Sequence, residues 1–248
     1  MSGGEPTLLG ANFLQIVDTS KRLLPQTALH VLTNGRLFTD QQFANDLGAI
    51  EHPDLMLGIP VYSDIDEDHD YVVQAKGAYD ETIQGLYHLA EAGVRIEIRV
   101  VVHALTYERL PQLAEFIYRN LPFASHVALM GLEMFGFVPQ NLSVLWVDPV
   151  SYREQLAEAV RALSYRGMTV SVYNHQLCTV PEEVWPFTRK SISDWKNVYL
   201  DACEPCGVKD LCGGFFQSAT KVHSAQIAPL PARDDVSMDQ LKRLVGAS

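Results

Sequence analysis

Apolar residues follow two alternating spacings along the chain, and this alternation predicts a repeated order of strands and helices. Runs rich in Val, Ile and Leu predict buried strands at 29–35, 54–61, 94–103, 126–132 and 168–173. Between them, apolar residues three or four positions apart predict helices at 77–92, 109–120 and 151–165. This order favours parallel strands with right-handed helical crossovers, in an open sheet or a barrel.

Polar and glycine residues follow several of these predicted strands. Ligands of such folds bind beyond the carboxyl ends of the strands. The residues that fall near such ends are Gly4-Glu5, Asn34-Gly35, Tyr62-Ser63, His103 and Glu133. Asn34-Gly35 by itself is typical of an ordinary turn. A histidine such as His103 is more often a hydrogen-bonded structural group than a catalytic one.

Composition excludes several classes of protein. The 248 residues are 47% hydrophobic and carry a net charge of −11, which argues against nucleic acid or an anionic membrane as the main ligand. The chain has neither a run of about 18 apolar residues nor a secretory signal pattern. We therefore expect a cytoplasmic protein.

The glycine turn Gly3-Gly4-Glu5-Pro6 is a candidate ligand-binding segment. Glycines at a strand end let backbone N–H groups approach a ligand closely, and Pro6 fits the first turn of a following helix. The carboxylate of Glu5 could accept hydrogen bonds from a ligand ammonium group. Four residues alone are equally typical of an ordinary loop.

Two charged segments have a functional and a structural interpretation. Arg99 lies within a predicted strand, where it would need an anion, but Glu97 shares its face and could simply pair with it. The acidic run Asp64–Asp70 is more typical of a solvated loop than of a cation site or a dock for a basic peptide.

The four cysteines give the strongest local signal. Cys203, Cys206 and Cys212 form a Cys-x2-Cys-x5-Cys pattern, and Cys178 could complete a set of four. In a reducing compartment such clusters are more often metal ligands than disulfides. Four thiolates suit zinc and an iron–sulfur cluster equally well.

The chain changes character after residue 167. We expect an α/β core at 1–167, a cysteine-rich extension at 168–230 and a loose tail at 231–248. Within the extension, Ser191-Ile192-Ser193-Asp194-Trp195 is more typical of a helix cap than of a site.

Taken in order, these segments resemble a radical S-adenosylmethionine enzyme with a cysteine-rich C-terminal extension. The segments are GGEP, LTNG, HDYVVQAKGAYDETIQGLYHLAEAG, IEIRVVVH and CEPCGVKDLCGGFF. Four segments of the second half are similar to the radical maturases of the His-Xaa-Ser peptide-modification system: VALMGLEMFGF, YNHQLC, SISDWKN and CGGFF. The resemblance extends from Ser2 to about Pro229.

The resemblance implies a partial (β/α)6 barrel that uses S-adenosylmethionine and a [4Fe–4S] cluster to make a 5′-deoxyadenosyl radical. By position, Gly3, Gly4, Glu5 and Pro6 would contact the methionine part of the cofactor. Ser63 and Arg99 match strand-end positions that contact its ribose or carboxylate. An auxiliary cluster would be bound by the cysteines Cys178, Cys203, Cys206 and Cys212. The implied partners are a ribosomally made precursor peptide and a second radical maturase.

The chain departs from this family in one respect. Its 248 residues contain no Cys-x3-Cys-x2-Cys motif, which in the family follows the first strand and holds the catalytic cluster. GGEP normally follows the second strand, so the first strands are expected to be missing, and the uncovered sheet edge predicts poor solubility or self-association. The alternative is a non-catalytic, zinc-stapled protein that binds a peptide or a partner.

Overall fold

The computed structural model describes residues 1, 4–191 and 197–232. Three predictions fall outside this part of the chain. They are the ligand role of Gly3, the helix cap at 191–195 except for Ser191 itself, and the tail from residue 233 on.

Six parallel strands form one sheet in which neighbours in space are also neighbours in sequence. Val31 lies beside Leu57, and Ile59 lies beside Ile98. The strands are β1 (Leu29–Leu32), β2 (Leu55–Pro60), β3 (Arg95–Val102), β4 (His126–Gly131), β5 (Val170–Tyr173) and β6 (Thr188–Arg189). The predicted α/β fold with a parallel sheet is confirmed, and β6, only two residues long, is the strand that the pattern did not reveal.

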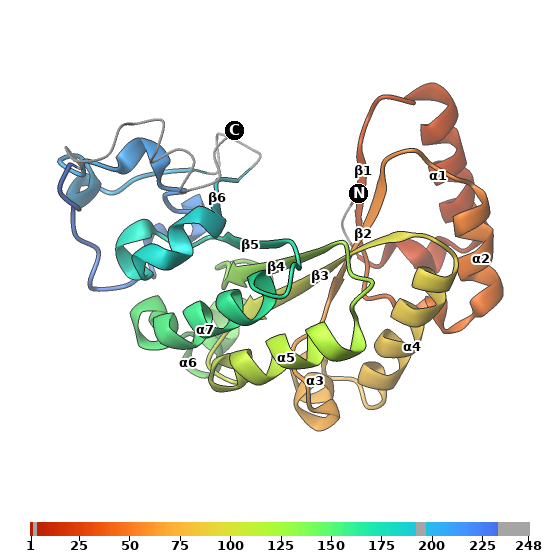
Figure 1. Cartoon of the computed structure of the whole chain (residues 1–248), viewed down its shortest axis with the longest axis horizontal. Coiled ribbons are helices and arrows are strands. Elements are labelled where there is room, and N and C mark those ends of the chain that lie inside the picture. The colour runs from red at the N-terminus through yellow and green to blue at the C-terminus, as the bar shows by residue number, and fades with distance from the viewer. Residues whose placement is uncertain (2–3, 192–196, 233–248) are drawn as a thin grey trace. The chain divides into compact units, whose positions relative to one another are not determined.

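Helices connect the strands (Figure 1). They are α1 (Ala11–Leu23), α2 (Gln41–Ala49), α3 (Asp66–Val73), α4 (Ala78–Glu91), α5 (Leu110–Asn120), α6 (Leu142–Leu145) and α7 (Arg153–Ser164). The three predicted helices are present as α4, α5 and α7. Helix α4 lies between Gly77 and Gly93, whose φ angles of 80° and 73° stop the helix at both ends.

The acidic run at 64–70 is not a loop. Asp66, Glu67 and Asp68 form the first turn of α3, where negative charge is favoured by the exposed N–H groups of the helix. Asp70 accepts hydrogen bonds from the backbone N–H groups of Gly77 and, at 2.8 Å, Tyr79. The expectation of a loop was therefore wrong, because most of the run is helical and Asp70 holds the first turn of the next helix, α4.

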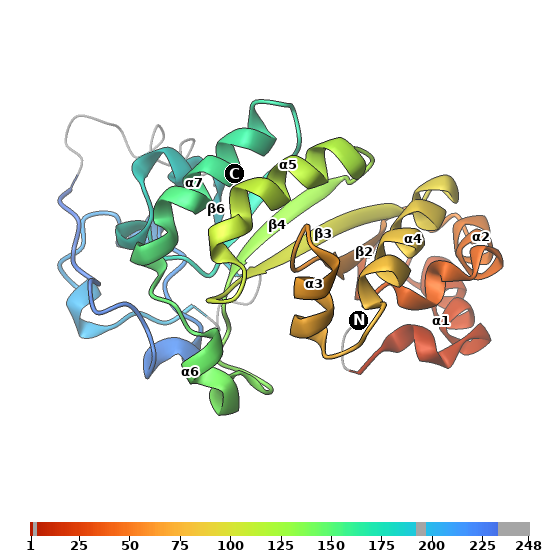
Figure 2. The same ribbon diagram turned by 90° about the horizontal axis from the view of Figure 1, so that it is seen from below.

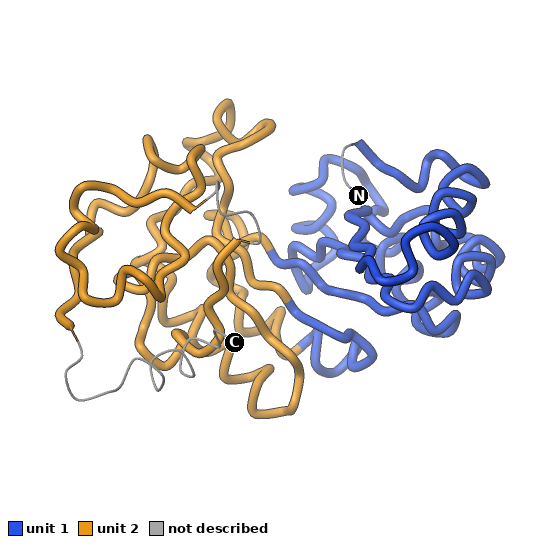
Figure 3. The backbone as a smooth tube through the Cα atoms, turned by 90° about the horizontal axis from the view of Figure 1, so that it is seen from above, with its two compact units in different colours: residues 1–100, 116–127 blue, residues 101–115, 128–248 orange. Residues whose placement is uncertain are grey.

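The chain divides into two compact units (Figure 3). The first contains residues 1–100 and 116–127, and the second contains residues 101–115 and 128–248. The predicted cysteine-rich extension falls entirely within the second unit. No helix in the described part of the chain is both long and apolar enough to cross a membrane.

In the first unit, one face of the sheet is apolar and is covered by helices. Val31, Leu57 and Ile98 point to this face and are fully buried. Helices α1, α2 and α4 lie together along it (Figure 2) and contribute Phe13, Leu47 and Leu86, among others. The opposite face carries the polar side chains that are described below, because successive residues of a strand point to opposite faces.

In the second unit, α7 packs against β5 and a 3-10 segment, Glu182–Phe187. Leu156, Val160 and Leu163 of α7 are buried. The indole N–H of Trp185 donates to the carbonyl of Leu177 at 3.1 Å. This contact fixes the chain just before Cys178. Beyond β6, turns and short 3-10 segments carry the remaining cysteines.

Candidate functional site

The main chain enters the glycine turn from a position beside β1. The amino group of Met1 donates to the carbonyl of His30 at 2.5 Å, and the carbonyl of Met1 accepts from the N–H of Leu32 at 3.0 Å. Met1 thus bonds the two residues that flank Val31, which is the hydrogen-bond pattern of parallel strands. Gly4 follows with a φ of 60°, and no described atom lies within 4 Å of the place a Cβ would take. Its backbone is therefore open to a close approach.

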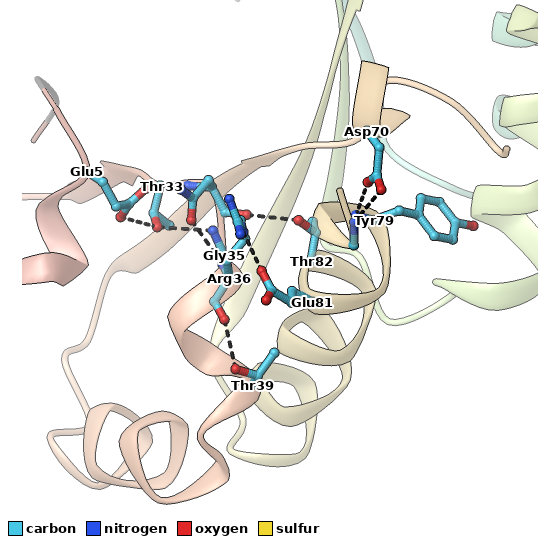
Figure 4. Close-up of polar contacts among 11 residues, drawn as sticks. Glu5, Thr33, Gly35, Arg36, Thr39, Asp70, Tyr79, Glu81 and Thr82 are labelled. Atoms are coloured by element: carbon cyan, nitrogen blue, oxygen red, sulfur yellow. Dashed lines mark hydrogen bonds and ion pairs between the residues drawn. The ribbon is translucent and has the colours of Figure 1, made fainter. Parts of the chain in front are cut away.

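The carboxylate of Glu5 joins the turn to the end of β1 (Figure 4). Oε1 accepts from the hydroxyls of Thr7 (2.7 Å) and Thr33 (2.6 Å) and from the N–H of Thr7 (3.1 Å). Oε2 accepts from the N–H of Asn34 at 2.7 Å. Pro6 begins a short 3-10 helix, as its position predicted. Because four donors use this carboxylate, the main chain of Gly4 and Glu5 is the part of the turn best placed for a ligand.

Helix α4 holds the turn that follows β1. The hydroxyl of Thr82 donates to the carbonyl of Asn34 at 3.3 Å, and Arg36 pairs with Glu81 at 2.5 Å (Figure 4). A Cβ on Gly85 would lie 2.3 Å from the carbonyl oxygen of Gly35. The helix therefore approaches the turn as closely as glycine allows. Sequence reasoning missed Gly85, because a lone glycine in a helix gives no signal of what it faces.

Ser63 is placed at a strand end, as predicted, and is buried. Its hydroxyl oxygen accepts from the N–H of Ile65 at 3.1 Å and lies 3.5 Å from Oδ2 of Asp68. Next to it, the N–H of Tyr62 donates to Nδ1 of His69 at 3.3 Å. Burial lowers the pKa of His69 to about 4, so this imidazole is neutral at pH 7 and can accept that bond.

Arg99 is part of an ionic cluster around the buried Glu97, on the polar face of the sheet. Its guanidinium donates to Oε1 of Glu97 at 2.8 Å, so these two side chains form the pair that their shared face allowed. Nδ1 of His126 donates to Oε2 of Glu97 at 2.7 Å, and Nε2 of His30 lies 3.4 Å from Oε1. Gly58 lies beneath the cluster, where a Cβ would be 2.9 Å from His30 Nε2 and 3.0 Å from Arg99 Cδ.

The cluster keeps Glu97 ionised. Burial alone would raise the pKa of Glu97, but its contacts with His126 and His30 and the charge of Arg99 hold that pKa below its ordinary value of 4.5. By contrast His103 is buried in the second unit, and burial lowers its pKa to about 4. It is therefore a neutral imidazole at pH 7.

The structure brings the four cysteines together. Cys178, Cys203, Cys206 and Cys212 all line one cavity in the second unit. Part of the space between its walls is open to solvent. The cysteines are only half-buried and form no disulfide. Cys178, which the local motif does not include, thus lies with the other three.

Backbone N–H groups surround the sulfur atoms. The N–H of Gly214 lies 3.4 Å from Sγ of Cys212, and the N–H of Leu230 lies 3.4 Å from Sγ of Cys206. Burial raises the pKa of Cys178 and of Cys212, although backbone hydrogen bonds act in the opposite direction. N–H groups that point at sulfur stabilise thiolates and tune the potentials of iron–sulfur clusters.

The spacing of these side chains bears on the kind of group that they could hold. Among the described residues, no three or more His, Cys, Asp or Glu side chains converge closely enough for one metal ion. A zinc ion would need its sulfur ligands about 2.3 Å from one centre. A cluster of several irons binds each cysteine to a different iron, so its ligands lie farther apart. The four thiols line one cavity, and their chemistry suits zinc and an iron–sulfur cluster alike.

Comparison with known proteins identifies the fold. No protein-family model and no curated protein matches the chain. Solved structures do. The fold resembles that of SuiB from Streptococcus suis. The match to SuiB bound to S-adenosylmethionine has a TM-score of 0.53 at 15% identity and covers 68% of this chain. A second structure of SuiB matches with the same TM-score and identity, and SuiB bound to its precursor peptide SuiA matches with a TM-score of 0.53 at 14% identity.

The likeness to SuiB concerns the fold. This chain spans 38% of the length of SuiB in the S-adenosylmethionine complex. The six parallel strands therefore resemble part of the SuiB fold, and in this chain the cysteines lie in the C-terminal region.

Proposed function

We propose that this chain is part of a radical S-adenosylmethionine enzyme that modifies a ribosomally made peptide. The observation that carries the proposal is the combination of a SuiB-like sheet with four cysteines around one cavity. SuiB has been seen with S-adenosylmethionine and with a precursor peptide. The enzyme as a whole would act by hydrogen abstraction, and the finer assignment of its substrate is a His-Xaa-Ser repeat peptide.

The cofactor half of the proposal rests on the first unit. Gly3, Gly4, Glu5 and Pro6 would hold the methionine part of S-adenosylmethionine. Gly4 offers open backbone at the end of the sheet, and the carboxylate of Glu5 fixes that backbone in place. Arg99 would face the cofactor carboxylate or ribose, with Glu97 holding its guanidinium. Ser63 would act by ordering the strand end and the start of α3, because its hydroxyl is already bonded there.

The cysteine half rests on the second unit. Cys178, Cys203, Cys206 and Cys212 would bind an auxiliary iron–sulfur cluster, which when present supplies electron transfer or rigidity. The shared cavity and the N–H groups directed at sulfur support this assignment. The rival is a zinc-stapled protein that binds a peptide or a second maturase, and it is supported by the absence of a Cys-x3-Cys-x2-Cys motif from these 248 residues.

Cofactor binding tests the proposal in the first unit. We expect saturable binding of ¹⁴C-labelled S-adenosylmethionine in equilibrium dialysis, weakened severalfold by Arg99→Lys. Lysine keeps a positive charge beside Glu97 but loses the planar fork that binds a carboxylate with two parallel bonds. Arg95→Lys, on the same strand but half exposed and paired with Asp54, is the matched control. Absence of saturable binding, or equal loss in both variants, would contradict the cofactor site.

A further inference from the structure

A second cavity lies in the same unit as the cysteines, and no proposed role uses it. It is lined by the ends of β4 and β5 and by residues that follow β6. Part of the space between its walls is open to solvent. We call it the Asn174 pocket. Its main lining side chains are Trp146, Tyr152, Asn174, Gln176, Phe215 and His223.

The floor of the Asn174 pocket is rigid. The hydroxyl of Tyr152 lies 2.9 Å from Nε2 of His175, and Nδ1 of His175 lies 2.9 Å from the carbonyl of Tyr173. Because a carbonyl can only accept, Nδ1 carries the proton and Nε2 accepts from Tyr152. Burial lowers the pKa of His175 to about 4, in agreement with this neutral tautomer.

Asn174 fixes the wall at the strand ends. Its φ of 57° is uncommon for a residue other than glycine. Its amide donates to the carbonyls of Gly131 at 3.1 Å and Leu132 at 3.2 Å. A Cβ on Gly131 would lie only 2.4 Å from the carbonyl oxygen of Asn174. Strained backbone that the surroundings hold in place is often found at ligand sites.

His223 supplies a polar atom that the described residues leave without a partner. Its Nδ1 is buried and makes no hydrogen bond in the described part of the chain, while its ring packs edge-on against Phe215 at 5.5 Å. Buried polar atoms are normally hydrogen-bonded, so an unpaired one in a residue that lines a pocket is a candidate partner for a ligand. The amide of Gln176 does not supply this bond to His223, because it donates to the carbonyl of Gly214 at 2.9 Å.

The lining of the pocket restricts what can enter. None of the described residues that line it is a lysine, arginine, aspartate or glutamate. A charged group would lose its hydration without gaining a counter-charge, which is costly. Aromatic rings of Trp146 and Phe215 favour a flat, apolar body. The exposed Phe135 and Phe137, in the segment that follows β4, add apolar surface after the same strand end.

We propose that the Asn174 pocket binds one uncharged, ring-bearing side chain of the substrate peptide, with Nδ1 of His223 as its hydrogen-bond partner. Gln176 and Phe215 line both this pocket and the four-cysteine cavity. The bound side chain therefore lies across a shared wall from the cysteines. This inference rests on the proposed function only in taking the ligand to be part of a peptide.

Fluorine NMR of the chain labelled with 5-fluorotryptophan tests the pocket, because Trp146 lies in its wall. Trp146→Phe assigns the resonance, and Trp185, buried elsewhere in the unit, is the internal reference. N-acetyl-L-tyrosinamide should shift the Trp146 signal saturably. N-acetyl-L-phenylalaninamide, which has the ring without the hydroxyl, should bind roughly three- to tenfold more weakly. N-acetyl-L-lysinamide should not shift it.

Two variants of His223 separate its hydrogen bond from its packing. His223→Asn places a polar atom near the position of Nδ1 and should keep the preference for the tyrosine probe. His223→Phe keeps a ring against Phe215 and should abolish that preference. No shift of Trp146 with any probe, an equal shift with the lysine probe, or an unchanged preference in His223→Phe would overturn the proposal. Iron content and S-adenosylmethionine binding, measured on the same samples, show whether the proposed function fails as well.

Discussion

Two ion pairs on β3 have nearly equal geometry and different burial, and they separate the effect of burial from that of contact. Arg99 lies 2.8 Å from Glu97, and their side chains are 22% and 6% exposed. Arg95 lies 2.9 Å from Asp54, and their side chains are 51% and 52% exposed. Each carboxylate can be made neutral by a change to its amide. Both changes remove one negative charge from a chain of net charge −11, so their effect on overall repulsion is the same.

We expect Glu97→Gln to lower the free energy of unfolding by about 3 kcal/mol, because it removes the buried negative charge that pairs with Arg99 and weakens the bond from His126. Asp54→Asn should cost less than about 1 kcal/mol, since water screens an exposed pair. For a chain of this size the two losses correspond to roughly 6–12 °C and at most about 4 °C in melting temperature.

Thermal and urea unfolding followed by circular dichroism at pH 7 measure both variants. The pKa of Glu97 lies below its ordinary value in the folded protein, so its contribution to stability is complete above about pH 4.5. That contribution is lost as the pH falls through the folded pKa. The difference between wild type and Glu97→Gln should therefore stay constant from pH 7 to pH 5 and shrink below pH 4. Equal losses in Glu97→Gln and Asp54→Asn would refute the reasoning.

Three further predictions concern other parts of the fold. Glu5→Ala should lower the free energy of unfolding by about 3 kcal/mol even without cofactor, since it removes the acceptor of the buried hydroxyls of Thr7 and Thr33. Glu81→Ala should cost less than about 1 kcal/mol; urea unfolding of both variants checks this, and equal losses would count against a structural role for Glu5. Gly85→Ala should lower the melting temperature by several degrees despite the better helix propensity of alanine, because its Cβ meets a backbone oxygen at 2.3 Å; a raised melting temperature would contradict this contact. Stability should fall as the pH drops from 6.5 to about 4, because the histidines are protonated in the unfolded chain while the buried His69 and His175 stay neutral in the folded one. His69→Gln should therefore make the free energy of unfolding depend less on pH in that window.

The sheet and its long helices could be predicted because their apolar periodicity is strong. The strands β1 to β5 and the helices α4, α5 and α7 all lie within the ranges that the pattern predicted. The two-residue strand β6 gives no periodic signal, and α2 was missed although Asp40 caps it by accepting from the N–H groups of Gln42 and Phe43. The apolar periodicity thus predicted the helices and strands that bury one face over several helical turns or several strand residues.

The site was predicted in its residue types more than in its contacts. The four cysteines were expected together, and they line one cavity. Glu5 was expected to reach for a ligand, but its carboxylate is used by Thr7, Thr33 and Asn34, partners distant by up to 29 positions. The sequence did not predict that His126 and His30 contact Glu97. Neighbours across strands depend on strand register, and the spacing of residues along one strand does not give that register.

Metal analysis of the anaerobically purified and reconstituted chain tests the central claim most directly. Iron, acid-labile sulfide and zinc are measured per chain in the wild type, in Cys178→Ser and in Cys203→Ser, with ultraviolet–visible absorption as a record of the bound group. The account predicts a brown protein with about four irons and four sulfides per chain, and a marked loss of both in each variant, since all four cysteines share the cavity. A colourless protein with one zinc ion, or iron retained in both variants, would contradict it.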